Sequence, residues 1–161
     1  MKKTVFVFFL LFFIPFFAIP DDNAVNCLSS GVKKLKSGDL SGAVADFDGA
    51  IRIDPRFGIA YLLRGNAKYR MGDFAGSIAD STKAIEINSG YTQAFVNRGN
   101  AKAALKDLKG ALKDLNKAIE LDPKNACAYG ARAAVKAGLN DKNVAKKDMN
   151  KAAELKRLRG I

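Results

Sequence analysis

A period of 34 residues runs through most of the chain, and it constrains the fold more than any other feature. Several independent columns of residues share this period. They are an Asp column, an Ala column and a column of small residues: Asp39, Asp73, Asp107 and Asp141; Ala50, Ala84, Ala118 and Ala152; Gly31, Gly65, Gly99 and Ala133. Because unrelated positions repeat together, the sequence predicts consecutive copies of one supersecondary unit.

Each copy holds two runs of about 12–14 residues in which the apolar residues have helical spacing. In the second copy, Ala60, Leu63 and Ala67 share one face of the first run. Gly38 and Gly72 predict left-handed turns after the first helix, and the Asp column predicts an N-cap for the second helix. No stretch alternates apolar and polar residues for long enough to indicate a strand. We therefore predict an all-α fold of helical hairpins.

These segments resemble the tetratricopeptide repeat. Residues 61–67 have the sequence YLLRGNA and residues 117–123 have the sequence KAIELDP, both similar to motifs of that family. The resemblance implies a right-handed superhelical α-solenoid of helix-turn-helix repeats, in which stacking buries faces that one hairpin leaves open. The implied organisation is a short linker at 21–23 and a repeat domain at 24–161, with repeats at 24–57, 58–91, 92–125 and a degenerate capping repeat at 126–159.

The first 20 residues have the composition of a targeting segment. Two Lys residues precede an apolar run from Val5 to Ile19, which holds seven of the eleven Phe residues. A basic start, an apolar centre and a polar exit predict a secretory signal peptide. Because Phe16 is too large for the usual cleavage pattern, an uncleaved signal anchor formed by residues 4–20 stays open as an alternative. Both interpretations predict export across a membrane, to a secreted, periplasmic or otherwise extracytoplasmic location.

The composition removes most catalytic and metal chemistry. The chain has no His, which is the commonest general base and a common metal ligand. Two Cys residues cannot form a four-cysteine zinc site, and the Gly residues follow the repeat period instead of forming a phosphate-binding loop. We predict a non-enzymatic protein without a cofactor or a metal.

The two Cys residues lie in the first and the fourth copy. Three repeat steps of about 10 Å each separate Cys27 from Cys127, which excludes an intramolecular disulfide. We expect both to pack as small apolar residues. An intermolecular disulfide through Cys127 is a minor hypothesis for an oxidising compartment.

Arg and Asp form two further columns that are offset by 16 residues. We favour Arg–Asp ion pairs within each hairpin, since an Arg fork suits a carboxylate. The alternative is a row of Arg side chains for an anionic ligand. The residues concerned are Arg64, Arg98 and Arg132 with Asp80, Asp114 and Asp148, while the first copy pairs Asp46 with Ser30.

The resemblance also implies a concave groove, lined by the first helix of each repeat, that holds an extended peptide. Some members bind chaperone tails through a carboxylate clamp, and Asn66 and Asn97 match its two Asn positions. Its basic positions fall on Leu62, Cys127 and Ala131, so the clamp is not intact and we expect no chaperone tail. We predict a more general peptide groove in which Asn side chains bond peptide backbone. Its partner-binding residues are Asn66, Tyr69, Arg70, Asn97 and Asn100.

Charge is concentrated at the end of the chain. The net charge is +11, and residues 126–161 contribute nine basic and three acidic side chains. Such a surface attracts anionic lipid or an acidic partner, although a solvated capping helix explains it equally well. Nucleic acid is a poor candidate because the segment has no interleaved aromatic residues. The predicted basic patch comprises Lys146, Lys147, Lys151, Lys156, Arg157 and Arg159.

Two functions follow from these observations. The leading hypothesis is an exported module or scaffold that binds a protein or peptide partner in the groove. The alternative is a scaffold that docks through its basic last repeat onto an anionic membrane surface, an acidic envelope polymer or an acidic partner.

Overall fold

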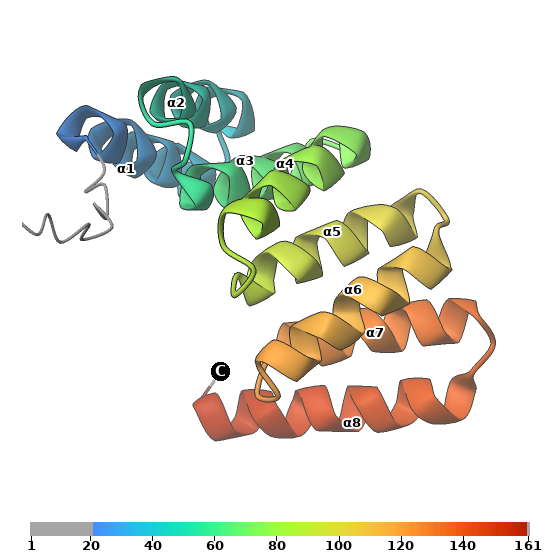
Figure 1. Cartoon of the computed structure of the whole chain (residues 1–161). Coiled ribbons are helices and arrows are strands. Elements are labelled where there is room, and N and C mark those ends of the chain that lie inside the picture. Colours follow the sequence, from blue (N-terminus) through green and yellow to red (C-terminus); the bar gives the residue numbers. More distant parts are fainter. Residues whose placement is uncertain (1–20, 161) are drawn as a thin grey trace, which may run out of the picture.

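The computed structural model describes residues 21–160, and the targeting segment predicted at 1–20 lies outside the described residues. Eight α-helices and no strand follow one another over these residues, which confirms the all-α prediction (Figure 1). None of these eight helices combines the length and the apolar character that a membrane span requires. Their bounds are α1 Asp22–Ser37, α2 Leu40–Ile53, α3 Gly58–Arg70, α4 Phe74–Ile87, α5 Thr92–Ala104, α6 Leu108–Leu121, α7 Ala126–Gly138 and α8 Lys142–Arg159.

The Asp column caps every even-numbered helix, as predicted. In α2, the Asp39 carboxylate accepts a hydrogen bond from the backbone N–H of Gly42 at 2.9 Å. Asp73, Asp107 and Asp141 each accept the equivalent bond from the backbone N–H of the residue three positions later. Each cap satisfies one of the N–H groups that the first helical turn leaves free.

The prediction of a linker at 21–23 is wrong, because residues 22 and 23 already belong to a helix. Helix α1 begins at Asp22, because the carboxylate of Asp21 accepts the backbone N–H of Asn23 at 2.7 Å and so caps the helix. The two consecutive acidic residues are therefore more than the polar end of the apolar segment. Their position at a helix N-terminus also places negative charge where the helix dipole favours it.

The turns inside the hairpins use a left-handed residue, but Gly provides it only in the first two repeats. Gly38 and Gly72 have φ of 88° and 87°. Lys106 and Asn140 take the same role in the third and fourth repeats, with φ of 67° and 62°. The turn therefore has the same shape throughout, although a side chain strains it in the later repeats.

The helices pair as antiparallel hairpins, and the hairpins stack into a solenoid (Figure 1). Odd-numbered helices also contact the next odd-numbered helix, as α3 contacts α5 and α5 contacts α7. Within residues 21–160, no two even-numbered helices contact each other. The stack therefore curves, with α1, α3, α5 and α7 on its inner side and the even-numbered helices on its outer side.

The core of each hairpin depends on the column of small residues. A Cβ built on Gly31 would lie 2.6 Å from the ring of Phe47, and one on Gly99 would lie 2.9 Å from Cγ of Leu115. Phe47 and Leu115 are fully buried as a result of this close approach. In the last repeat, Ala133 replaces the Gly, and Met149, which follows Leu115 in its column, is 58% exposed.

Candidate peptide-binding groove

Arg and Asp pair across each of the last three hairpins, which confirms the structural interpretation of these columns. The guanidinium of Arg98 donates from Nε and Nη2 to both carboxylate oxygens of Asp114, at 2.9 and 2.7 Å. Arg132 binds Asp148 in the same bidentate way, at 2.7 Å for each bond. Arg64 and Asp80 form the equivalent pair. The three Asp residues are buried, so each of these carboxylates is fully engaged inside the protein.

Each Arg also reaches the hairpin before its own, a contact that the pairing within one hairpin does not predict. Nη1 of Arg98 donates to Oγ1 of Thr82 at 3.1 Å, and Nη1 of Arg132 donates to Oδ1 of Asn116 at 2.8 Å. Arg64 pairs with Asp48 in the equivalent position. The signal was present in the sequence, because these partners lie 16 residues before each Arg just as the Asp lies 16 residues after it.

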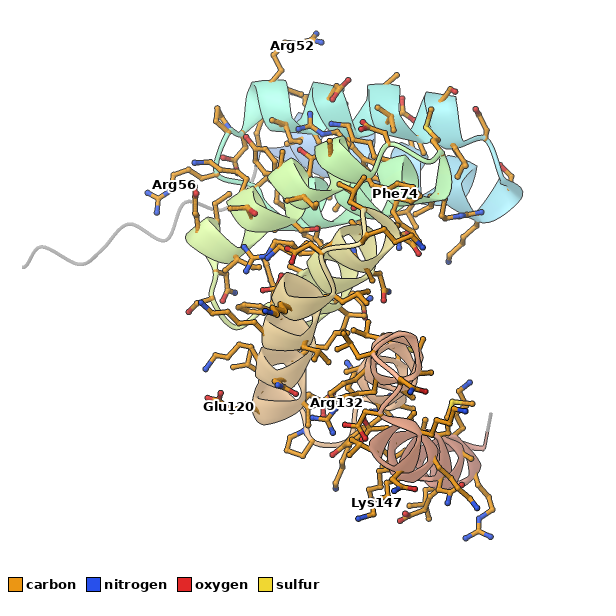
Figure 2. The ribbon with its side chains drawn as sticks, turned by 90° about the vertical axis from the view of Figure 1, so that its right-hand side faces the viewer. Arg52, Arg56, Phe74, Glu120, Arg132 and Lys147 are labelled. Atoms are coloured by element: carbon orange, nitrogen blue, oxygen red, sulfur yellow. The ribbon has the colours of Figure 1, made fainter. Side chains whose placement is uncertain are left out.

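We call this series of Arg side chains and their partners the arginine ladder. Each guanidinium also lies over an aromatic ring three residues earlier, at 5.3–5.5 Å from the ring centroid. The hydrogen bonds that Arg64 donates to Asp80 and that Arg132 donates to Asp148 raise the pKa of both Arg side chains above the ordinary value. The ladder joins successive repeats (Figure 2, Arg132), and its cations are not available to an anionic ligand.

A smaller ion pair takes the place of the ladder in the first repeat. The Lys34 ammonium lies 2.8 Å from Asp46, and Ser30 donates a hydrogen bond to the same carboxylate. Both interactions hold the pKa of the Asp46 carboxyl below its usual range. The first hairpin thus keeps the acidic column without an Arg.

A pocket of about 470 Å³ opens where α3, α5, α7 and α8 converge. Most of its lining is apolar and made of small side chains. Among its lining residues Lys156 is the charged one, and no carboxylate contributes to it. The residues that line it are Tyr69, Asn100, Ala126, Cys127, Gly130, Ala131, Met149, Ala152, Ala153 and Lys156. We call this the end pocket.

Of the five predicted groove residues, the structure brings Tyr69 and Asn100 to the end pocket. Asn97 is 5% exposed, and its amide is used internally: it accepts from Gln93 at 2.9 Å and donates to the carbonyl of Leu62 at 3.5 Å. The prediction that Asn97 binds a partner is therefore wrong, because packing between α3 and α5 covers it.

Arg70 and Asn66 lie on the inner helix α3 but do not line the end pocket. Arg70 donates from Nη1 to the backbone carbonyl of Leu35 at 3.1 Å, near the C-terminal end of α1. Asn66 is half-buried. The predicted groove residues thus divide into a pair at the end pocket and a pair closer to α1.

The predicted basic patch is also divided by the structure. Lys156 lines the end pocket, whereas Lys151 forms an ion pair with Glu154 at 3.1 Å. The three carboxylates of the last repeat are all in ion pairs, with Lys151, Arg132 and Lys136. Six cations of α8 have no ion pair with any residue between 21 and 160, and they are Lys142, Lys146, Lys147, Lys156, Arg157 and Arg159.

Sequence reasoning missed the apolar floor of the end pocket. Cys127 and Ala131 occupy clamp positions of the groove, and the sequence marks them only as departures from the clamp. Cys127 is exposed there, so the expectation that it packs as a small apolar residue is wrong. Met149 belongs to a column that is buried in the first three repeats, so its exposure could not be read from the column.

Between residues 21 and 160, no three His, Cys, Asp or Glu side chains lie close enough together to hold a metal ion. Both Cys residues are free thiols. The arrangement offers packing surface, hydrogen-bond donors and positive charge.

Comparison with known proteins supports this description. Two models described as tetratricopeptide repeat match residues 59–91 and 92–125. No curated protein gives a significant match. Among solved structures, the first repeat domain of Spaghetti (RPAP3) bound to the HSP90 peptide SRMEEVD is 28% identical, with a TM-score of 0.72, and the match covers 74% of this chain and 94% of that one.

Two further structures extend the comparison. The first repeat domain of human RPAP3 is 29% identical, with a TM-score of 0.71, over 75% of this chain and 95% of that one. The thermophilic repeat protein TTC0263 of Thermus thermophilus is 20% identical, with a TM-score of 0.78, over 83% of this chain and 75% of that one, and it shows the fold alone. The chain is thus an all-α helical-repeat solenoid, in which residues 59–91 and 92–125 are similar to tetratricopeptide repeats.

Proposed function

We propose that this protein is an interaction module that holds a peptide segment of a partner protein in the groove on the inner side of its solenoid. The observation that carries the proposal is the end pocket, a largely apolar hollow formed by three successive inner helices and α8. Tetratricopeptide repeats mediate binding of proteins and peptides, and the Spaghetti domain holds its peptide on a similar fold. Affinity arises from packing and hydrogen bonds, and the ligand undergoes no reaction.

The ligand differs from a chaperone tail. Leu62, Cys127 and Ala131 provide no cation at the three basic positions of the clamp, so an SRMEEVD-like end loses the charge pairing that such a clamp provides. The partner is selected instead by the apolar floor of the pocket and by the polar groups at its edge.

We also propose that residues 1–20 direct the chain across a membrane, so that the groove meets its partner outside the cytoplasm. The apolar run flanked by Lys and Asp supports this location. Mass determination of the mature protein distinguishes a cleaved signal from a retained anchor. An N-terminus at Met1 in a protein that stays soluble in the cytoplasm would contradict export.

A second candidate function is docking of α8 on anionic lipid. Six cations of α8 that form no ion pair within residues 21–160 support it, and so does Leu158, which is 71% exposed between Arg157 and Arg159. Flotation with phosphatidylglycerol vesicles tests this candidate. We expect such binding to disappear near ~0.5 M salt, where screening shortens to a few Å, whereas groove binding persists.

The groove itself is tested with peptides selected by phage display on the full-length chain. The variant Cys127→Trp fills the end pocket, and Lys113→Trp places the same bulk on the outer helix α6 as a matched control. We expect selected peptides to lose at least about tenfold in affinity with Cys127→Trp and to keep their affinity with Lys113→Trp. Equal affinity for both variants, with circular dichroism showing both folded, would place the peptide elsewhere and overturn the proposal.

A further inference from the structure

We propose that the end pocket is specific for acidic segments, in which an apolar side chain enters the pocket and a neighbouring Asp or Glu carboxylate binds Lys156. The inference rests on the proposed groove function and names the ligand class for it. The juxtaposition that supports it is a small-residue floor from α7 and α8 beside one cation and two neutral donors.

The floor of the pocket suits an apolar side chain. Ala126, Gly130, Ala131 and Ala153 leave the space, and a Cβ added to Gly130 would meet nothing within 4 Å. Met149 borders this space with 58% of its surface exposed. Met adapts its shape to what it packs against, and apolar surface left open to water gains free energy when a ligand covers it.

The polar groups at the edge are all able to donate, and all three are unengaged. Within residues 21–160, neither Nζ of Lys156, nor the amide of Asn100, nor the hydroxyl of Tyr69 has a side-chain hydrogen bond or an ion pair. This separates them from Asn97 and Arg70, which the protein uses internally. Three free donors, of which one is a cation, match a carboxylate, which accepts up to four hydrogen bonds.

The unpaired charges near the pocket are positive, like the charge of Lys156. Every carboxylate of the last repeat is paired, while six cations of α8 stay unpaired in the part of the chain described by the structure. The long-range field of this helix attracts acidic segments and opposes basic ones, which adds to association rate and to specificity. An acidic peptide with an apolar anchor is attracted by the positive charge of α8 and packs on the apolar floor of the pocket.

The exposed thiol of Cys127 reports directly on occupancy, because it lines the pocket. The test uses the full-length chain with Cys27→Ser, which leaves Cys127 as its single thiol, and follows alkylation by N-ethylmaleimide by mass spectrometry. The probes are four peptides capped at both ends: acetyl-SELLEG-amide, its Gln version SQLLQG, its Lys version SKLLKG, and SEGGEG, which lacks the apolar anchor.

We expect acetyl-SELLEG-amide at about 10 mM to slow alkylation about fivefold, and the other three peptides to slow it less than about twofold. In Lys156→Glu the preference should reverse, so that the Lys version protects and the Glu version does not. Lys147→Glu makes the same charge change on the same helix outside the pocket lining, and it should keep the original preference (Figure 2).

Equal protection by the Glu and Gln versions, or no protection by any peptide, would overturn the inference. Protection of Cys127 by phosphatidylglycerol vesicles equal to that by the Glu version would also overturn it, in favour of a lipid site. If phage-selected peptides depend on Cys127→Trp but not on Lys156→Glu, this inference fails while the groove function stands. If no peptide binds the groove, both fail.

Discussion

The second and third repeats, at 58–91 and 92–125, have the same architecture but fill it differently. In the third repeat Leu115 is fully buried against Gly99. In the second repeat Ser81 takes the same column, and Ser77 takes the place of Ala111. Both hydroxyls are fully buried and have no hydrogen-bond partner within the part of the chain that the structure describes. Helical hairpins of the same shape therefore form around an apolar core in the third repeat and around a core with two unpaired hydroxyl groups in the second.

The features that the two repeats share indicate which interactions determine the geometry of a repeat. Both hairpins keep the Gly of the small column, the Asp cap and the bidentate Arg–Asp pair. The large apolar residue is replaced without a change of fold. In these two repeats the close backbone approach and the Arg–Asp pair are kept together with the shape, whereas the apolar column contributes mainly to stability.

Removal of the buried Asp of each repeat is expected to have the largest effect on stability. Asp114→Ala leaves Arg98 and Lys102 without their carboxylate, and we expect a loss of about 3–5 kcal/mol in the free energy of unfolding. Asp80→Ala should cost less, because Arg64 retains Asp48, whereas Arg98 retains only the hydroxyl of Thr82. Urea denaturation measures both. Equal losses would mean that the bond to the preceding repeat does not matter.

The column of small residues leaves less space in the third repeat than in the second. Gly99→Ala places a methyl group 2.9 Å from Leu115, so we expect a loss of about 1–3 kcal/mol in spite of the better helix propensity of Ala. In Gly65→Ala the atoms nearest to the new methyl group lie at 3.2–3.3 Å. The gain in helix propensity, about 1 kcal/mol, offsets the cost of this tight contact. Thermal unfolding of the two variants should separate them clearly. The comparison fails if Gly65→Ala is the more damaging change.

The buried hydroxyls offer a way to improve the weaker repeat. Ser81→Ala removes an unpaired polar group, and we expect it to stabilise the protein by about 1 kcal/mol. Ser41→Ala on the exposed start of α2 serves as a control and should stay within about 0.5 kcal/mol. A destabilised Ser81→Ala would show that the hydroxyl has a partner, such as a buried water.

The smallest effect is expected in the turns. Lys106 has φ of 67°, so Lys106→Gly should relieve strain and stabilise the third repeat by less than about 1 kcal/mol. Gly72→Ala makes the opposite change in the second repeat and should destabilise it by a similar amount. Midpoints of urea denaturation measure both changes. If Lys106→Gly is neutral, the unfolded-state entropy of Gly cancels the relief.

Features that depend on one hairpin could be predicted from the sequence. The Asp caps, the left-handed turns at Gly38 and Gly72 and the pairing of Arg98 with Asp114 follow from spacing within 16 residues or fewer. The arginine ladder lay within reach too, because its second partner has the same spacing in the opposite direction.

Features that depend on packing between repeats could not be predicted in this way. The burial of Asn97 results from its contact with Leu62 on the preceding inner helix. The end pocket combines Tyr69 with Lys156, which are far apart in sequence and meet through the curvature of the stack. A repeat pattern determines neighbours along the chain, but the angle between hairpins decides which side chains share a hollow.

The arginine ladder has a consequence for how such a chain can lengthen. Because every junction uses an Arg, a polar partner 16 residues before it and an Asp 16 residues after it, the face that carries the Arg in repeats two to four matches the opposite face of the repeat before it. A duplicate of residues 92–125 inserted after residue 125 would bring its own Arg to Asn116 and present its own Asn to Arg132. Growth by whole copies of an Arg-bearing repeat is therefore free of mismatched charges, whereas a partial copy would leave a buried cation without its anion.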